Sequence, residues 1–79
     1  MIQTVDLFLS KKDQIAEFIR QKTWARTSDV MKFGLSIYTT RGDRYARELA
    51  EEGRIKRMSD DMKDLRFGPT REDIWEWVG

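Results

Sequence analysis

Apolar residues recur at helical spacing in three stretches of the chain, and each stretch starts beside a residue that can cap a helix. The first stretch predicts a helix over 11–22, with Ser10 as its N-cap. The second predicts a helix over 28–38. The third predicts a helix over 41–52, ended by Gly53, which suits the position just after a helix C-terminus. The pattern therefore favours a mainly α fold.

The second stretch leaves an alternative open. Gly34 costs about 1 kcal/mol inside a helix, and it can instead act as a C-cap that ends the helix at Phe33. If the helix does reach Tyr38, residues 39–40 form a tight turn into the third helix, which is helix-turn-helix spacing. Just before the second helix, Thr and Trp in 23–26 predict a brief strand.

After Gly53 the pattern changes from helix to hairpin. Residues 54–58 and 64–67 are predicted to pair as two strands, joined by turn residues at 59–61. On the second strand Leu65 should face inward, as should Phe67 two positions later. The expected class is thus mainly α with a small β-hairpin.

Both ends of the chain are ambiguous. Residues 1–9 fit either an N-terminal arm or an early extension of the first helix. Residues 69–79 form a C-terminal tail that can be helical or extended, and only an extended chain puts Trp75 and Trp77 on the same face.

The apolar stripes of these elements converge on one predicted core. Its residues are Ile15, Phe18, Ile19, Val30, Met31, Ala46, Leu49, Ile55 and Phe67. A chain of 79 residues supports a single domain, 1–79, with only a small core. The third helix turns its other side outward, and this side is rich in arginine.

Composition narrows the function classes. The chain has no cysteine and no histidine, which removes disulfides, thiolate zinc sites and imidazole acid/base chemistry. We therefore expect no enzyme, no catalytic residues, no metal and no cofactor. No apolar run is long enough to span a bilayer, so we expect a cytoplasmic protein. The net charge of +1 makes any electrostatic argument depend on local distribution.

The order of these elements resembles that of a winged helix-turn-helix domain. Three predicted helices precede a hairpin, and the junction from Tyr45 to Arg57 has the Leu-x-x-x-Gly-x-Ile pattern that leads a recognition helix into a wing. The resemblance covers Ser10 to Phe67, within a core unit of 10–68, and departs at Gly34 and in an acidic, glycine-free wing tip. Many members bind DNA in bacterial, archaeal and phage regulators or replication proteins, and others bind proteins.

By that resemblance the candidate DNA-binding residues lie on the recognition helix and the wing. They are Thr40, Arg41, Arg44 and Arg47 on the helix, and Lys63 and Arg66 on the wing. The plain alternative is a solvated helix face, in which Arg44 pairs with Glu48 and Arg47 with Glu51.

Lys56 and Arg57, with Arg54, form the densest basic cluster of the sequence. On the strand that leaves the recognition helix they can reach a DNA backbone. They can equally serve to protect an edge strand with charge. Both interpretations stay open at this point.

Two functions of different classes follow. The first is a small regulatory or architectural protein that binds double-stranded DNA, with helix 41–52 in the major groove and the hairpin 54–67 as wing. The second is a protein-interaction module that assembles through its apolar termini, most simply as a homodimer through Met1–Leu9 and Ile74–Val78.

Overall fold

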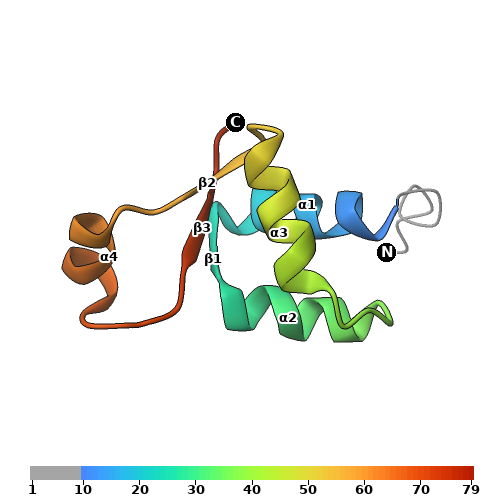
Figure 1. Ribbon diagram of the computed structural model, residues 1–79, viewed down its shortest axis with the longest axis horizontal. Helices are drawn as coiled ribbons and strands as arrows, with labels where there is room; N and C mark the ends of the chain where they lie inside the picture. Colours follow the sequence, from blue (N-terminus) through green and yellow to red (C-terminus); the bar gives the residue numbers. More distant parts are fainter. Residues whose placement is uncertain (1–9) are drawn as a thin grey trace.

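Three helices pack together beside a small antiparallel sheet, and a fourth helix stands apart at the far end of that sheet (Figure 1). The computed structural model describes residues 10–79, and the expectations for 1–9 lie outside this range. The elements, in chain order, are α1 (Lys11–Lys22), β1 (Trp24–Arg26), α2 (Thr27–Ser36), α3 (Gly42–Glu51), β2 (Ile55–Arg57), α4 (Asp60–Phe67) and β3 (Ile74–Trp77). The expected mainly α class is confirmed.

The first helix and the strand after it match their predictions. The side chain of Ser10 accepts a hydrogen bond of 3.1 Å from the backbone N–H of Asp13, so the predicted N-cap of α1 is present. Ile15 and Ile19 are fully buried on the inner face of this helix. The strand expected at 23–26 is β1, which leads directly into α2.

Gly34 lies inside α2 and does not end it, so the alternative that placed the helix end at Phe33 is wrong. A Cβ at Gly34 would lie 3.3 Å from the backbone oxygen of Thr39, because the chain folds back over the helix here. The N–H of Thr39 donates to the oxygen of Gly34 at 2.9 Å. The helix itself ends at Ser36, two residues earlier than Tyr38, and the longer turn that follows leads into α3.

The turn places α3 against α2 at very close range. A Cβ on Gly42 would lie 3.0 Å from the backbone oxygen of Val30 and 3.2 Å from Cα of Met31. Only glycine allows the two helix backbones to approach this closely. The other end of α3 is followed by Gly53 at φ 78°, the left-handed conformation expected of a helix stop. The expected tight turn at 39–40 is wrong, because α2 ends before Tyr38, but α2 and α3 still follow one another as two packed helices joined by a turn.

The hairpin predicted between 54–58 and 64–67 is wrong. β2 pairs with β3, and residues 60–67 form α4 instead of a second strand. The reason is local: Ser59 caps α4 by accepting from the N–H of Met62, and two aspartates occupy the favourable first turn. The turn-like residues at 59–61 are thus a helix start. Leu65, expected to face inward, is 80% exposed.

The chain near its C-terminus supplies the central strand of the sheet, so it is extended and belongs to the folded unit. The strand order is β1-β3-β2, with both pairings antiparallel. Trp75 lies opposite Ala25 on one side and Arg57 on the other. Its side chain is only 3% exposed. Residues 74–77 thus complete the sheet and close the core from that side.

Most of the predicted core is confirmed. Those fully buried are Ile15, Ile19, Val30, Ala46, Leu49 and Ile55. Met31 is 42% exposed and was predicted wrongly, whereas Phe18 and Phe67 are half-buried. Phe18 stacks on Phe33 with ring centroids 4.4 Å apart. Further buried apolar residues that the predicted core did not include are Ala16, Ala25, Met58, Ile74 and Trp75.

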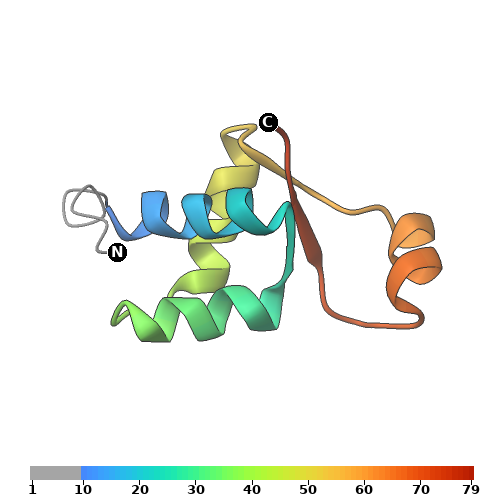
Figure 2. The same cartoon turned by 180° about the vertical axis from the view of Figure 1, so that it is seen from behind.

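The view from behind shows how α4 relates to the rest (Figure 2). Two extended segments connect it to the sheet, and it lies well away from the three-helix body in both views (Figures 1 and 2). Its last residue, Phe67, packs edge-on against Trp24 of β1, with centroids 4.6 Å apart. The whole arrangement is a winged helix-like fold whose wing carries a helix between its two strands.

Candidate nucleic-acid interface

The outer face of α3 carries the arginines that the sequence assigned to a partner. Tyr45 is half-buried and Leu49 fully buried, so the side of the helix that they occupy packs against the core as predicted. The side chains of Arg44 and Arg47 are 67% and 66% exposed. Thr40, just before the helix, is exposed as well. These residues therefore form one accessible row along α3.

Each arginine of this row forms an ion pair with a carboxylate of its own helix. Nε of Arg44 lies 3.8 Å from Oε2 of Glu48. Arg47 donates to Oδ2 of Asp43 at 3.2 Å, so its partner lies one turn back and the expected pairing with Glu51 is wrong. Exposed pairs of this kind contribute only about 0.2–1 kcal/mol. An anionic group of a binding partner can therefore displace either carboxylate from its arginine at a small cost in free energy.

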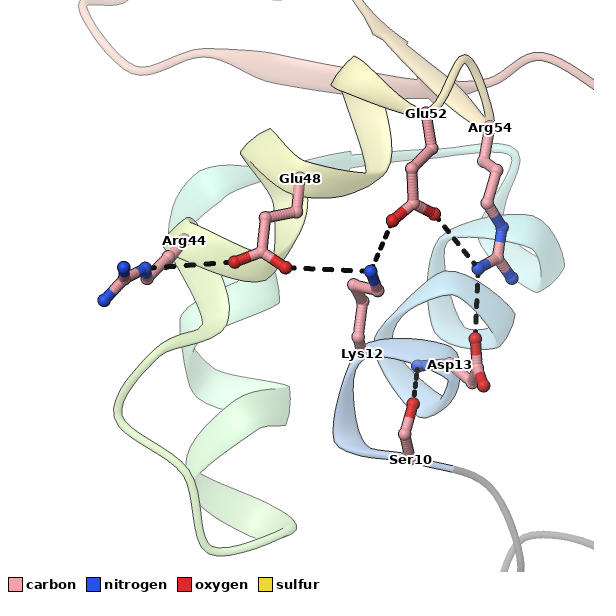
Figure 3. A network of polar contacts seen from close by, with 7 residues as sticks. All are labelled: Ser10, Lys12, Asp13, Arg44, Glu48, Glu52 and Arg54. Carbon is pink, nitrogen blue, oxygen red and sulfur yellow. Dashed lines mark hydrogen bonds and ion pairs between the residues drawn. The ribbon is translucent and has the colours of Figure 1, made fainter.

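A second set of charges joins the C-terminal half of α3 to α1 (Figure 3). Nζ of Lys12 lies 3.7 Å from Oε1 of Glu48 and also donates to Glu52. Arg54 donates to Asp13 at 3.0 Å and lies 3.6 Å from Glu52. The acids on this side of α3 are thus balanced by cations from outside the helix.

The pKa values in this network shift in the directions that favour the charged forms of its side chains. The hydrogen bond from Lys12 lowers the pKa of Glu52 below its ordinary value, and the same bond raises the pKa of Lys12. The hydrogen bond from Arg54 lowers the pKa of Asp13. All three groups are therefore ionised at neutral pH.

Beside α3, β2 carries the predicted basic cluster at the edge of the sheet. Lys56 and Arg57 are both exposed. The Arg57 guanidinium lies 5.7 Å from the ring centroid of Trp75, and its Nε is 3.5 Å from Asp73. Cation–π contact holds such a side chain close to the sheet surface. Arg54, in contrast, points back to α1 and forms ion pairs with Asp13 and Glu52.

An open hollow of about 240 Å³ lies where α3 meets the sheet. It is lined by Arg47, Ala50, Glu51, Arg57 and Trp75. Two of the predicted DNA-binding residues, one from the helix and one from β2, thus share one surface. Trp75 contributes an aromatic wall that the sequence reasoning did not place there, because its strand had no predicted partner.

Some predicted site residues make no ion pair anywhere in the described chain: Arg41, Lys56 and Arg66. Arg41 is exposed at the start of α3, beside Thr40. Arg66 is exposed too, but it lies on α4, which stands away from α3 (Figure 1). The structure thus brings Arg47 of α3 and Arg57 of β2 together around one hollow and leaves Arg66 at a distance.

Lys63 does not lie on the open surface where its predicted role would place it. Only 7% of the residue is exposed. Its Nζ donates to the backbone oxygen of Glu72 at 3.2 Å and lies 3.7 Å from Asp60. Lys63 therefore connects α4 to the segment before β3, because the predicted hairpin is replaced by a helix that turns this side chain inward.

Residues 10–79 lack both a metal site and a membrane-spanning helix. No group of three or more acidic side chains lies close enough to hold a metal ion in this part of the chain. None of the helices in this part is long and apolar enough to cross a membrane.

Comparison with known proteins gives one family. Residues 11–61 match the family model described as FaeA-like protein, which is well over half of the chain. The match runs from α1 through the helix-turn-helix and β2 into the first turn of α4. No curated protein and no solved structure matches the chain.

Proposed function

The chain belongs to the FaeA-like protein family, and on this premise we propose that it is a small regulatory protein that binds double-stranded DNA through α3. The family supports a regulator with a winged-helix-like fold. The observation that carries the proposal further is the exposed row formed by Thr40, Arg44 and Arg47. The helix presents this row away from the core, so binding requires no rearrangement of the fold.

The dimensions of α3 suit the major groove. Ten residues make a helix about 15 Å long, and the groove admits an α-helix. Arg44 and Arg47 are one turn apart on its outer face, and arginine is the most frequent reader of guanine. Their present partners are exposed carboxylates, which a phosphate or a base edge replaces at little cost.

The edge strand β2 extends this surface towards the DNA backbone. Arg57 is exposed beside the C-terminal half of α3, where it shares a hollow with Arg47, and Lys56 is exposed on the opposite face of the same strand. Residues in such a position neutralise phosphates and fix the register of the helix without reading sequence. We assign Arg66 the same kind of role at a more distant phosphate, since α4 extends beyond the sheet.

The near-neutral charge of the chain is compatible with this function because the acids are distributed unevenly. Glu48 and Glu52 face α1 and are balanced there. Glu51 lines the hollow and makes no ion pair with any residue from 10 to 79. We expect Glu51 to lie at the margin of the DNA footprint, where an unpaired acid disfavours phosphate.

A second candidate, a protein-interaction module, is supported by apolar side chains on the surface. Leu35 and Tyr38 are exposed on α2 and the turn after it, and Leu65 is exposed on α4. The C-terminal part of the expected dimer surface is not available to a partner, because Ile74 and Trp75 are buried inside the domain. A homodimer that uses residues 1–9 stays a prediction.

Titration of fluorescent duplex DNA of random sequence at two salt concentrations tests the proposal. A protein that neutralises several phosphates loses affinity steeply as salt rises. We expect saturable binding at low salt and a log–log slope corresponding to about three or four phosphates, in keeping with Arg44, Arg47, Lys56 and Arg57. Absence of binding at low salt would reject the proposal and favour the interaction module.

A further inference from the structure

The side chain of Lys12 reaches from α1 to two carboxylates on α3 (Figure 3). Its Nζ lies 3.7 Å from Oε1 of Glu48 and donates to Oε2 of Glu52. Glu48 meets Arg44 through its other oxygen, Oε2, at 3.8 Å. Glu48 therefore has two cations, one on each oxygen.

We propose that Lys12 is a positioning residue for DNA binding, which keeps Glu48 balanced when Arg44 leaves it for the DNA. The inference rests on the proposed function of α3. When a phosphate or base takes Arg44, the carboxylate keeps Lys12 on its second oxygen, so no unpaired acid is left facing the DNA. Without Lys12, the same exchange would leave Glu48 with no cation.

The charges of the network support this role. Three cations, Lys12, Arg44 and Arg54, face three carboxylates, those of Asp13, Glu48 and Glu52. Arg54 is shared between Asp13 and Glu52, so it cannot replace Lys12 at Glu48. Once Arg44 has moved to the DNA, the network holds two cations against three carboxylates with Lys12 and one against three without it, so loss of Lys12 changes its net charge from −1 to −2. Glu48 lies 3.8 Å from Arg44 of the outer row, well inside the Debye length of about 10 Å, so salt screens its charge only in part.

Geometry explains why the cation comes from α1. Lys12 is in the first turn of α1, beside the N-cap Ser10 and next to Asp13. The flexible side chain of a lysine allows its ammonium group to contact two carboxylates at once. The position of Lys12 does not depend on where the Arg44 side chain lies. Lys12 can thus stay on Glu48 and Glu52 while Arg44 moves.

Two other roles for Lys12 make different predictions. If Lys12 itself touches a phosphate, its removal costs one phosphate contact and reduces the salt slope by about one, whatever the charge on α3. If it only fastens α1 to α3, its removal lowers thermal stability and leaves the affinity of the folded protein unchanged. Removal of the two carboxylates distinguishes these cases from the proposed role.

The experiment uses the full chain and measures duplex DNA affinity, its salt slope and the melting temperature. We compare Lys12→Met and Lys12→Arg in the parent, and Lys12→Met in a Glu48→Gln/Glu52→Gln background. Lys12→Met should weaken binding about threefold to tenfold with an unchanged salt slope. Lys12→Arg should bind within about twofold of the parent, because the cation is retained.

In the background without the two carboxylates, Lys12→Met should change affinity by less than about twofold, since no acid is left to balance. A full loss that persists in that background, with a slope reduced by about one, would overturn the proposal in favour of direct contact. Equal affinity of Lys12→Met and parent would overturn it as well. A parent that fails to bind DNA would instead reject the function on which the inference rests.

Discussion

Trp75, in the central strand, donates from its indole Nε1 to the hydroxyl of Thr27 at 3.1 Å, across 48 positions of sequence. The same hydroxyl donates to the backbone oxygen of Asp73 at 2.9 Å. The first residue of α2 is thereby attached to the strand that closes the core. This bond therefore helps to fix the start of α2 against the sheet, together with the backbone hydrogen bond of 3.0 Å from the N–H of Thr27 to the oxygen of Asp73.

Replacement of Thr27 should reveal the strength of this attachment. Thr27→Val keeps the shape of the side chain but leaves the N–H of a buried tryptophan without its acceptor, which costs about 1–3 kcal/mol. Thr27→Ser retains the hydroxyl and should lose less. Urea denaturation followed by tryptophan fluorescence measures both. Equal stability of the Val and Ser variants would show that the hydrogen bond contributes nothing.

Two leucines provide a matched test of the core. Leu49 on α3 is fully buried, so Leu49→Ala should cost about 2–5 kcal/mol, enough to unfold much of a domain this small. Leu65 on α4 is largely exposed, and Leu65→Ala should change the free energy of unfolding by less than about 0.5 kcal/mol. The melting temperatures of the two variants and the parent measure this difference. A parent-like melt of Leu49→Ala would mean that α3 faces the other way.

Lys63 should affect stability and not DNA binding. Its nearly buried side chain donates to the backbone oxygen of Glu72, so Lys63→Ala leaves that acceptor unpaired and should cost about 1–3 kcal/mol. The folded variant should bind duplex DNA with the affinity of the parent. The control is Arg71→Ala, which removes an exposed cation from the same segment. A variant of unchanged stability that binds DNA more weakly would restore Lys63 to the interface.

The acid side of the stability curve should depend on the α1–α3 network. The pKa of Glu52 is lowered by its hydrogen bond to Lys12, and that of Asp13 by its bond to Arg54. A carboxyl whose pKa is lowered by folding stabilises the fold when the pH is above its ordinary pKa, which is 4.5 for Glu and 3.8 for Asp. This contribution is lost as the pH falls through the folded pKa.

We therefore expect the free energy of unfolding to be level from pH 7 to about 5 and to fall below that. Glu52→Gln should make this fall shallower. Glu51→Gln is the control, because Glu51 has no ion pair with residues 10–79. Denaturant titrations between pH 2 and 7 measure the difference. An acid limb that is the same in Glu52→Gln as in the parent would contradict this role of the network.

The helices of the body could be predicted because their signals are local. A capping serine at residue 10, an apolar stripe and a terminal glycine at residue 53 lie within a few positions of the elements they define. The outward direction of Arg44 and Arg47 follows from the same helical period. The part of the candidate site that lies on α3 was therefore accessible from the sequence.

The wing could not be predicted because its pairing is not local. Ser59 followed by two aspartates fits a hairpin turn and a helix N-cap equally well, and only the tertiary fold decides between them. The true partner of β2 lies about 20 positions further on, beyond α4 and the Gly68-Pro69 turn, where no local signal marks it as the partner strand. Lys63 and Leu65 were misplaced for the same reason.

The role of Lys12 was also hidden from the sequence. In the sequence Lys12 is only a polar residue in the first turn of the predicted helix 11–22, with no signal that links it to another helix. The structure instead places it on Glu48 and Glu52, which are distant in sequence. A charge that acts through another helix leaves no periodic signal, so only the packing of α1 on α3 reveals it.

The most direct test of the account compares the duplex DNA affinity of Arg44→Ala/Arg47→Ala with that of Arg20→Ala at low salt. Arg20 is a matched control, an exposed arginine on α1 that pairs with Glu17 on its own helix. The double variant should bind at least about tenfold more weakly at unchanged melting temperature, because each base-reading arginine contributes about 1–3 kcal/mol. Arg20→Ala should bind as the parent does. Equal affinity of all three proteins, or no binding by the parent, would contradict the placement of α3 in the major groove.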